Sequence, residues 1–179
     1  PTQLEPCFAT GADYLFQPDK LYGEYDSGDR TFQCARRIDV LKLWLCWKHH
    51  GDAGFARRID HAVDMADHTR SIIDRSDGAF VPVVAGTFTN VVFVWVPPEL
   101  RPLHLATATT AHREQLHRLA PMIKARMQAE GTAMVGFQPV HGINAFRLLF
   151  MNPAVQPDDV EAVLGLIATY GEQEWANLA

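Results

Sequence analysis

The predicted fold depends on the sequence NVVFVWV at residues 90–96, which is followed at once by Pro97 and Pro98. Its apolar residues are mainly β-branched or aromatic, as in a buried strand, and prolines end a strand because they donate no ladder hydrogen bond. The apolar run at residues 91–98 is also much shorter than the roughly 20 residues that a membrane-spanning helix requires. We therefore expect a strand here and no membrane span.

Strand and helix patterns alternate on both sides of this run. Short β-rich segments occur at residues 80–84, 132–138 and 145–151. One apolar stripe at helical spacing precedes the last two strands and another follows them. Pro121 within the first stripe predicts a kink or a helix that begins there. The order β-β-α-β-β-α favours an α+β domain, a four-stranded antiparallel sheet with helices on one face. The stripe residues are Leu116, Leu119, Ile123 and Met127, and then Val160, Val163, Leu164, Ile167 and Tyr170.

The first part of the chain has a different pattern. Residues 1–31 are irregular, and residues 32–50 show a helical pattern that Gly51 ends, with a second helix expected from Asp52. Because apolar residues surround much of the first helix, we expect it to be largely buried. Residues 1–47 do not make a complete domain, so we expect the end of a larger domain there and a separate domain at residues 48–179. The chain begins at Pro1 rather than Met, as expected for an excerpt or a trimmed form.

Composition narrows the classes of function. The chain has 16 Lys and Arg residues against 21 Asp and Glu residues, a net charge of -5. This balance is a poor electrostatic match for DNA or RNA. The 3 cysteines are an odd number without zinc-binding spacing. We expect reduced thiols in a cytoplasmic protein that does not bind nucleic acid.

Two histidine groups are candidates for a metal or catalytic site. His61, Asp64 and His68 stand at helical spacing on one face, and His and Asp are ligands of transition metals. A solvated helix face with ion pairs explains the same pattern and is favoured, so no metal is expected. His49 and His50 precede Gly51, where polar residues suit the last turn of a helix. Capping is therefore favoured over catalysis.

Tyr14 and Arg147 are the two remaining candidates. A tyrosine on a mobile loop can deliver a proton to a reacting carbon, although composition alone favours a packed aromatic loop around Tyr14. Arg147 stands between Phe146 and Leu148 in an apolar strand. It either occupies the solvent face of an alternating strand or binds a carboxylate bidentately. The residues by themselves leave these two interpretations open.

Longer motifs connect the chain to a known family. In order along nearly the whole chain, they resemble the group II pyridoxal-phosphate decarboxylases, and most of all the glutamate and cysteine sulfinate decarboxylase branch. The motifs are YLFQPDK at residues 14–20, DSGD at 26–29, QCARRID at 33–39, WVPPELR at 95–101, GFQP at 136–139, Phe146-Arg147 and Asn152-Pro153.

The resemblance implies an α/β type I pyridoxal-phosphate enzyme fold in the parent protein, of which this chain is the C-terminal part. Residues 1–47 would then be the end of the large domain, with the catalytic loop at about residues 11–25 and an interface helix. Residues 48–179 would be the small C-terminal domain. The resemblance also implies a homodimer with active sites at the interface.

The resemblance assigns roles to both open candidates. Tyr14 matches the loop tyrosine that returns a proton to the substrate carbon after CO₂ has left. Arg147 matches the arginine that binds the carboxylate of acidic substrates. The lysine that holds pyridoxal phosphate covalently has no match, and Lys20, Lys42 and Lys48 fall at other family positions. We expect that lysine upstream of residue 1, so the chain alone is expected to be inactive.

The expected function is thus part of an enzyme, a carboxy-lyase that acts on a small acidic amino acid and uses pyridoxal phosphate. Glutamate, cysteine sulfinate and aspartate each present a second acid group to Arg147. Two alternatives are a lysine-less paralogue that serves as a binding or regulatory subunit, and a decarboxylase of another amino acid. An unrelated α+β interaction domain is a third.

Overall fold

The structure of this chain is a computed structural model, and it describes residues 4–9, 38–86 and 88–178. The chain divides into two compact units, Pro1–Asp52 and Ala53–Ala179. The junction follows Asp52, whereas the sequence pattern placed it between residues 47 and 48. No helix within the described ranges is long and apolar enough to cross a membrane.

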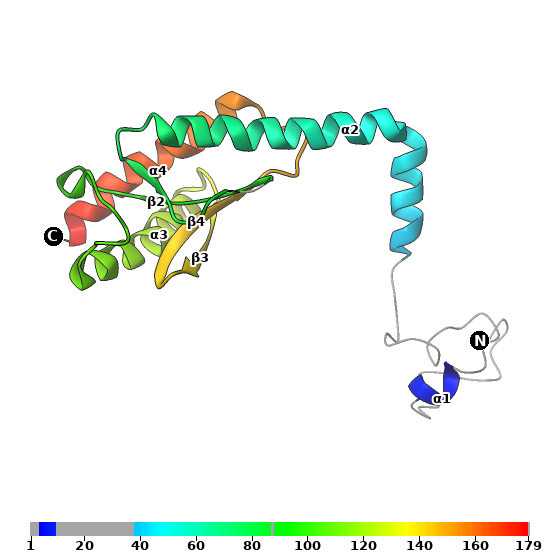
Figure 1. The fold of residues 1–179 in the computed structure, drawn as a ribbon, viewed down its shortest axis with the longest axis horizontal. Helices are drawn as coiled ribbons and strands as arrows, with labels where there is room; N and C mark the ends of the chain where they lie inside the picture. Colours follow the sequence, from blue (N-terminus) through cyan, green and yellow to red (C-terminus); the bar gives the residue numbers. More distant parts are fainter. Residues whose placement is uncertain (1–3, 10–37, 87, 179) are drawn as a thin grey trace. The chain divides into compact units, whose positions relative to one another are not determined.

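The second unit contains the predicted sheet. Its four strands are all antiparallel, in the order β1-β2-β4-β3 (Figure 1). The strand at the apolar run and the element order β-β-α-β-β-α are confirmed. The strands are β1 at Phe80–Pro82, β2 at Asn90–Trp95, β3 at Gly136–Val140 and β4 at Ile143–Leu149.

The β3–β4 hairpin differs from the prediction in its limits. β3 begins later than residue 132, and β4 begins before residue 145. The reason is a two-residue turn at His141 and Gly142, whose φ angles are 49° and 79°. Both positive φ angles match the tight turns that join antiparallel strands and set their register. Pro139 is tolerated in β3 because this strand is at the edge of the sheet.

Helix α3 spans Thr110–Glu130 and passes through Pro121 without a break. It therefore begins well before Pro121, which corrects the alternative that the proline starts the helix. The Thr109 side chain accepts a hydrogen bond from the His112 N–H (3.2 Å) and caps the helix. Gly131 ends it in the left-handed conformation, at φ 67°.

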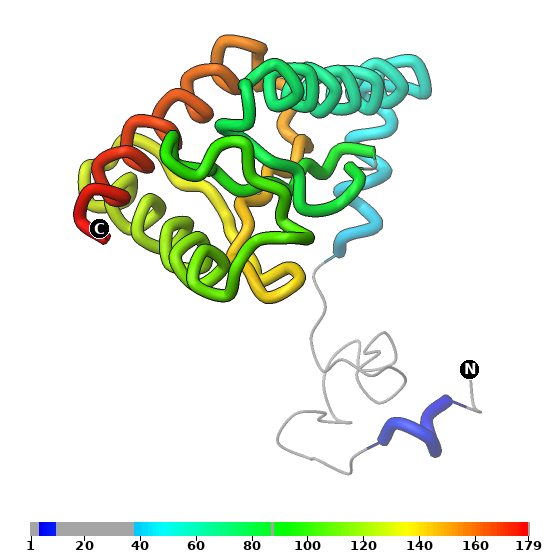
Figure 2. Tube along the Cα trace, turned by 60° about the vertical axis from the view of Figure 1, so that its left-hand side comes forward, coloured from blue at the N-terminus to red at the C-terminus, as the bar shows by residue number. Residues whose placement is uncertain are grey.

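Two more helical elements, η3 and α4, belong to this unit. A short 3-10 helix, η3, spans Pro98–Leu100 just after β2, and α4 spans Pro157–Leu178. Figure 2 shows α3 and α4 lying side by side. At the start of α4, the Asp159 carboxylate accepts a hydrogen bond from the Gln156 N–H (2.9 Å). This contact satisfies a backbone donor that the helix itself cannot pair.

One face of the sheet carries the aromatic core. Phe93 of β2 lies opposite Phe146 of β4, with ring centroids 5.9 Å apart, and it meets the Phe80 ring edge-on at 5.5 Å. Trp95 shares this face and is 1% exposed. α3 contacts the same face, because Asn144 Nδ2 of β4 donates to the His117 carbonyl (2.8 Å).

The opposite face is covered over only part of its length. Val92 and Val94 of β2 point away from Phe93 and are nonetheless buried. Leucines 100, 103 and 105 of the connection after β2 pack against the hydrophobic core. β4 is buried at its first four positions, and beyond them Arg147 and Leu149, which share this face, are exposed. One end of this face is therefore accessible.

Helix α2 spans Asp39–Asp74, with non-helical angles at Gly51 (φ 63°, ψ 179°). The glycine interrupts the helix where the sequence predicted, since residues with a Cβ rarely adopt this conformation. The predicted burial of the segment before Gly51 is wrong for the described chain, because Val40 is 76% exposed, Trp44 54% and Trp47 47%. An apolar helix is expected to pack against other residues, but the described residues of this unit do not bury these side chains.

A close approach between α4 and the core gives a test of the packing. A methyl group added at Gly171 would lie 2.6 Å from Trp95 Cδ2, whereas nothing lies within 4 Å of one added at Gly165. We expect Gly171→Ala to lower the free energy of unfolding by about 1–3 kcal/mol through overpacking. The matched Gly165→Ala should raise it by up to ~1 kcal/mol, because alanine loses less entropy in a helix. Urea denaturation of the full chain measures both, and equal effects would contradict this packing.

A second prediction concerns the contact between α3 and α4. A hydrogen bond from the Tyr170 hydroxyl (2.8 Å) lowers the pKa of Glu130 below its ordinary value of 4.5, and a hydrogen bond from Arg126 adds a smaller effect in the same direction. A lowered carboxyl pKa adds stability above the unfolded-state pKa, and this stability is lost as pH falls through the folded-state pKa. We expect Tyr170→Phe to raise the Glu130 pKa, measured by NMR titration. The stability difference between the two proteins should then shrink in acid below pH 4.5. An unchanged titration would contradict the role of the Tyr170 hydroxyl.

Candidate functional site

Arg147 is the predicted site residue that the structure places, because Tyr14 lies outside the described residues. β4 runs between β2 and β3, and Arg147 lies opposite Val92 of β2 and Gly136 of β3. Phe146, the preceding residue, is 1% exposed on the core face. Strand alternation therefore puts Arg147 on the other face, where it is exposed. This position needs no buried counter-ion and leaves the guanidinium accessible.

The contacts of Arg147 leave its charge uncompensated. Its Nη1 donates to the Gln138 amide oxygen of β3 at 3.2 Å. None of the ion pairs among the described residues involves Arg147. A guanidinium presents several donors in a planar fork that matches a carboxylate. The arrangement therefore has the donors and the charge to bind an acid group.

Apolar side chains are exposed at the same end of the sheet. Leu149 and Met151 follow Arg147 at two-residue intervals and are 48% and 75% exposed. Phe88 precedes β2 and is 66% exposed. A cation next to such side chains suits a ligand that has an acid group on a short carbon chain.

The predicted histidine group forms contacts within the fold. His61 Nε2 lies 2.8 Å from the Val155 carbonyl oxygen, and His68 Nε2 lies 3.4 Å from a Glu161 carboxylate oxygen. Both histidines are half-buried, so the interpretation of this face as solvated is wrong for them. They connect α2 to α4 and to the segment before it. Within the ranges described, no three His, Cys, Asp or Glu residues are grouped to hold a metal ion.

His49 and His50 lie in α2 just before Gly51. Their rings meet edge-on with centroids 4.5 Å apart. Capping by these residues stays a prediction.

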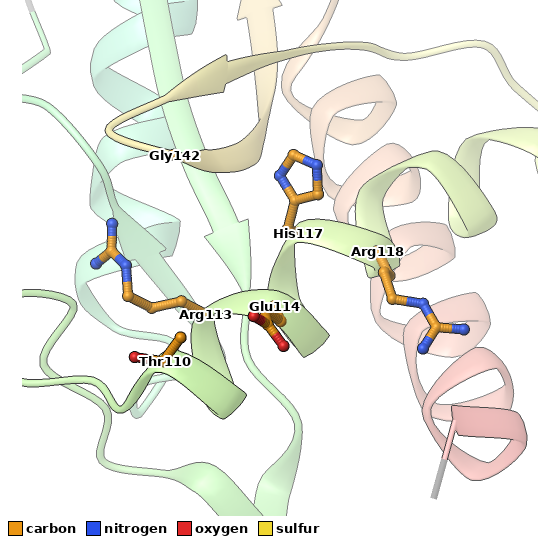
Figure 3. Close-up of a pocket in the computed structure, with 6 residues that line it drawn as sticks. All are labelled: Thr110, Arg113, Glu114, His117, Arg118 and Gly142. Carbon is orange, nitrogen blue, oxygen red and sulfur yellow. The ribbon is translucent and has the colours of Figure 1, made fainter.

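A cavity of about 580 Å³ opens beside the first turns of α3. The sequence patterns single out none of its lining residues, and Figure 3 shows why they form no convergent site: Arg113 and Arg118 point in opposite directions. Arg113 donates to the carbonyl oxygens of Leu105 (2.9 Å) and His141, so it ties two loops together. The lining residues are Thr110, Arg113, Glu114, His117, Arg118 and Gly142.

Comparison with known proteins identifies the family. The family model described as "Pyridoxal-dependent decarboxylase conserved domain" matches residues 1–96, more than half of the chain. This chain belongs to the pyridoxal-dependent decarboxylase family. The family resemblance that the motifs predicted is thereby confirmed.

The relatives of this decarboxylase chain are similar over its whole length. It is 40% identical over 172 residues to cysteine sulfinic acid decarboxylase of mouse and to that of human, matches that cover 94% of this chain and 34% of each relative. The crystal structure of mouse CSAD in the apo form superposes with a TM-score of 0.74 at 35% identity, over 95% of this chain and 34% of that one. The decarboxylase chain thus spans about a third of the length of the curated relatives it matches. The matched part is their C-terminal part, and the α+β fold predicted for this domain is confirmed.

A covalent site for pyridoxal phosphate needs a lysine amine. The described lysines have other contacts: Lys42 pairs with Asp39 at 3.0 Å, and Lys48 lies over the Trp44 ring. Lys124 lies over the Phe137 ring, 5.4 Å from its centroid.

Proposed function

We propose that the enzyme to which this chain belongs removes the α-carboxylate of a small acidic amino acid as CO₂. The observation that carries this proposal is the exposed Arg147 guanidinium, which has a neutral hydrogen-bond partner and no described counter-ion. The 40% identity to two cysteine sulfinic acid decarboxylases supports an acidic substrate. Cysteine sulfinate, glutamate and aspartate all carry the required second acid group.

Arg147 would bind the acid group that the reaction retains. A bidentate pair with a carboxylate or sulfinate fixes both distance and orientation. Hydrogen bonds to charged groups contribute on the order of 1.5–3 kcal/mol, which is tenfold or more in an equilibrium constant. This anchoring would orient the opposite end of the substrate, where the α-carboxylate leaves.

Tyr14 would return a proton to the substrate carbon after CO₂ has left. The family match extends over its position. Pyridoxal phosphate, when bound elsewhere in the enzyme, supplies the electron sink for this chemistry. The contribution of Tyr14 would be the phenolic proton.

The proposal extends to assembly and location. We infer that residues 1–47 end the large domain, that residues 48–179 form the small one, and that two subunits form a homodimer with active sites at their interface. The exposed apolar side chains of Val40, Trp44 and Trp47 support contact with a further surface. A cytoplasmic location is proposed from the three cysteines without disulfide or zinc spacing.

The role of Arg147 is tested by Arg147→Lys in the complete enzyme. Lysine keeps the charge but loses the planar fork. We expect kcat/KM for the acidic substrate to fall at least tenfold while the cofactor absorbance stays unchanged. The control is Arg118→Lys, an exposed residue on α3 that points away from its neighbours in Figure 3. Unchanged kinetics in Arg147→Lys would exclude the role.

The role of Tyr14 is tested by Tyr14→Phe, which removes the phenolic hydroxyl group and with it the proton donor. We expect slower decarboxylation and a larger share of abortive transamination, measured as the ratio of the two products. Tyr170→Phe is the matched control, because that hydroxyl contacts Glu130 and Thr132 within the fold. If the product ratio and rate survive in Tyr14→Phe, the tyrosine is structural.

A further inference from the structure

The orientation of Arg147 depends on one side chain of the neighbouring strand. In the β3–β4 register, Gly136 lies opposite Arg147 and Gln138 lies opposite Ala145. Gln138 is thus the diagonal neighbour of Arg147 on the same face, a separation that long side chains can bridge. Arg147 Nη1 donates to the Gln138 amide oxygen at 3.2 Å.

The two residues directly opposite Arg147 cannot hold its guanidinium. Gly136 has no side chain, and Val92 on the β2 side is apolar and buried. Asn90 of β2 is a second polar diagonal neighbour, but the hydrogen bond of Arg147 goes to Gln138. Because a guanidinium only donates hydrogen bonds, the amide oxygen of Gln138 must face it.

A neutral acceptor suits this position. A carboxylate at residue 138 would form an ion pair with Arg147 and compete with an acid ligand for the same donors. The amide fixes one nitrogen of the fork and leaves the positive charge uncompensated. The remaining donors therefore stay available to a ligand.

The backbone that carries Gln138 is itself restrained. Pro139 follows it directly and restricts its conformation. The hairpin closes within two residues at His141 and Gly142, and Arg113 donates a hydrogen bond to the His141 carbonyl. The amide is therefore presented from a fixed strand.

We propose that Gln138 is a positioning residue, which holds the Arg147 guanidinium in the orientation that binds the side-chain acid of the substrate. This inference rests on the proposed function of Arg147. It adds a specificity-determining residue that contributes through Arg147.

The test is a double-mutant cycle in the complete enzyme, with the wild type, Gln138→Met, Arg147→Ala and the double variant. Methionine keeps a similar length but removes the strong acceptor. We expect Gln138→Met to raise KM for the acidic substrate about tenfold, the size associated with one hydrogen bond to a charged group, with kcat nearly unchanged. The double variant should be no worse than Arg147→Ala, because Gln138 acts through Arg147.

Two further variants sharpen the readout. Gln138→Glu should raise KM more than Gln138→Met, because the new carboxylate competes for the guanidinium. It also decides the question if Gln138→Met fails to fold, in which case an unchanged KM in Gln138→Glu overturns the inference. Gln173→Met on the exposed surface of α4 is the matched control and should leave KM unchanged.

The outcomes separate this inference from the proposed function. A raised KM in Gln138→Met that disappears in the Arg147→Ala background supports it. An unchanged KM, or a loss that adds fully to that of Arg147→Ala, overturns it and leaves the role of Arg147 intact. If Arg147→Ala itself keeps the KM of the wild type, both the inference and the substrate role of Arg147 are overturned.

Discussion

Phe93 and Phe146 face each other across the β2–β4 pair, and their contact sets the geometry of the second unit. Side chains alternate along a strand, so this contact places Phe146 in the core and Arg147 on the opposite face. A register slip of one residue would put the arginine into the core and Phe146 into solvent. Burying an unpaired charge is far more costly than losing one ring contact. The aromatic pair and the arginine therefore select the same register.

The two faces of the sheet are covered in different ways. Helices α3 and α4 cover the aromatic face, and α4 approaches so closely that Gly171 meets the Trp95 ring. On the other face, Val92 and Val94 of β2 are buried, while Arg147 and Leu149 of β4 are exposed. A binding residue can occupy this exposed part of the face without disturbing the aromatic core.

The sequence patterns identified most elements of this unit but little of the site geometry. Prolines follow the apolar run at residues 90–96, and Gly51 has a positive φ that residues with a Cβ rarely adopt. Both features depend on local sequence, so the sequence could predict them. The contact of His61 with Val155 joins residues far apart in the chain, and helical spacing carries no information about it. The Gln138–Arg147 bond depends on the hairpin register, and that register depends on the turn at His141 and Gly142, which the strand patterns did not locate. The exposure of Trp44 was not predicted, because an apolar helix indicates a buried surface but does not show which part of the protein covers it. The role of Tyr14 stays a prediction.

The arginines of this fold show what distinguishes Arg147. Arg126 bridges Glu130 and Glu174, and Arg70 pairs with Asp67, so these charges are compensated within the fold. Arg75, Arg101 and Arg113 take part in none of the ion pairs among the described residues and donate to backbone carbonyl oxygens. Arg147 also has no such ion pair, but it donates to a side-chain amide. A charged residue at an exposed strand position contributes little to stability without an ion pair, and β-branched residues suit a strand better. An arginine at this position therefore adds little to the stability of the fold. Its positive charge and its remaining hydrogen-bond donors are available to an acid ligand. Stability alone therefore gives little reason for an arginine at this position, in keeping with the acid-binding role proposed for it.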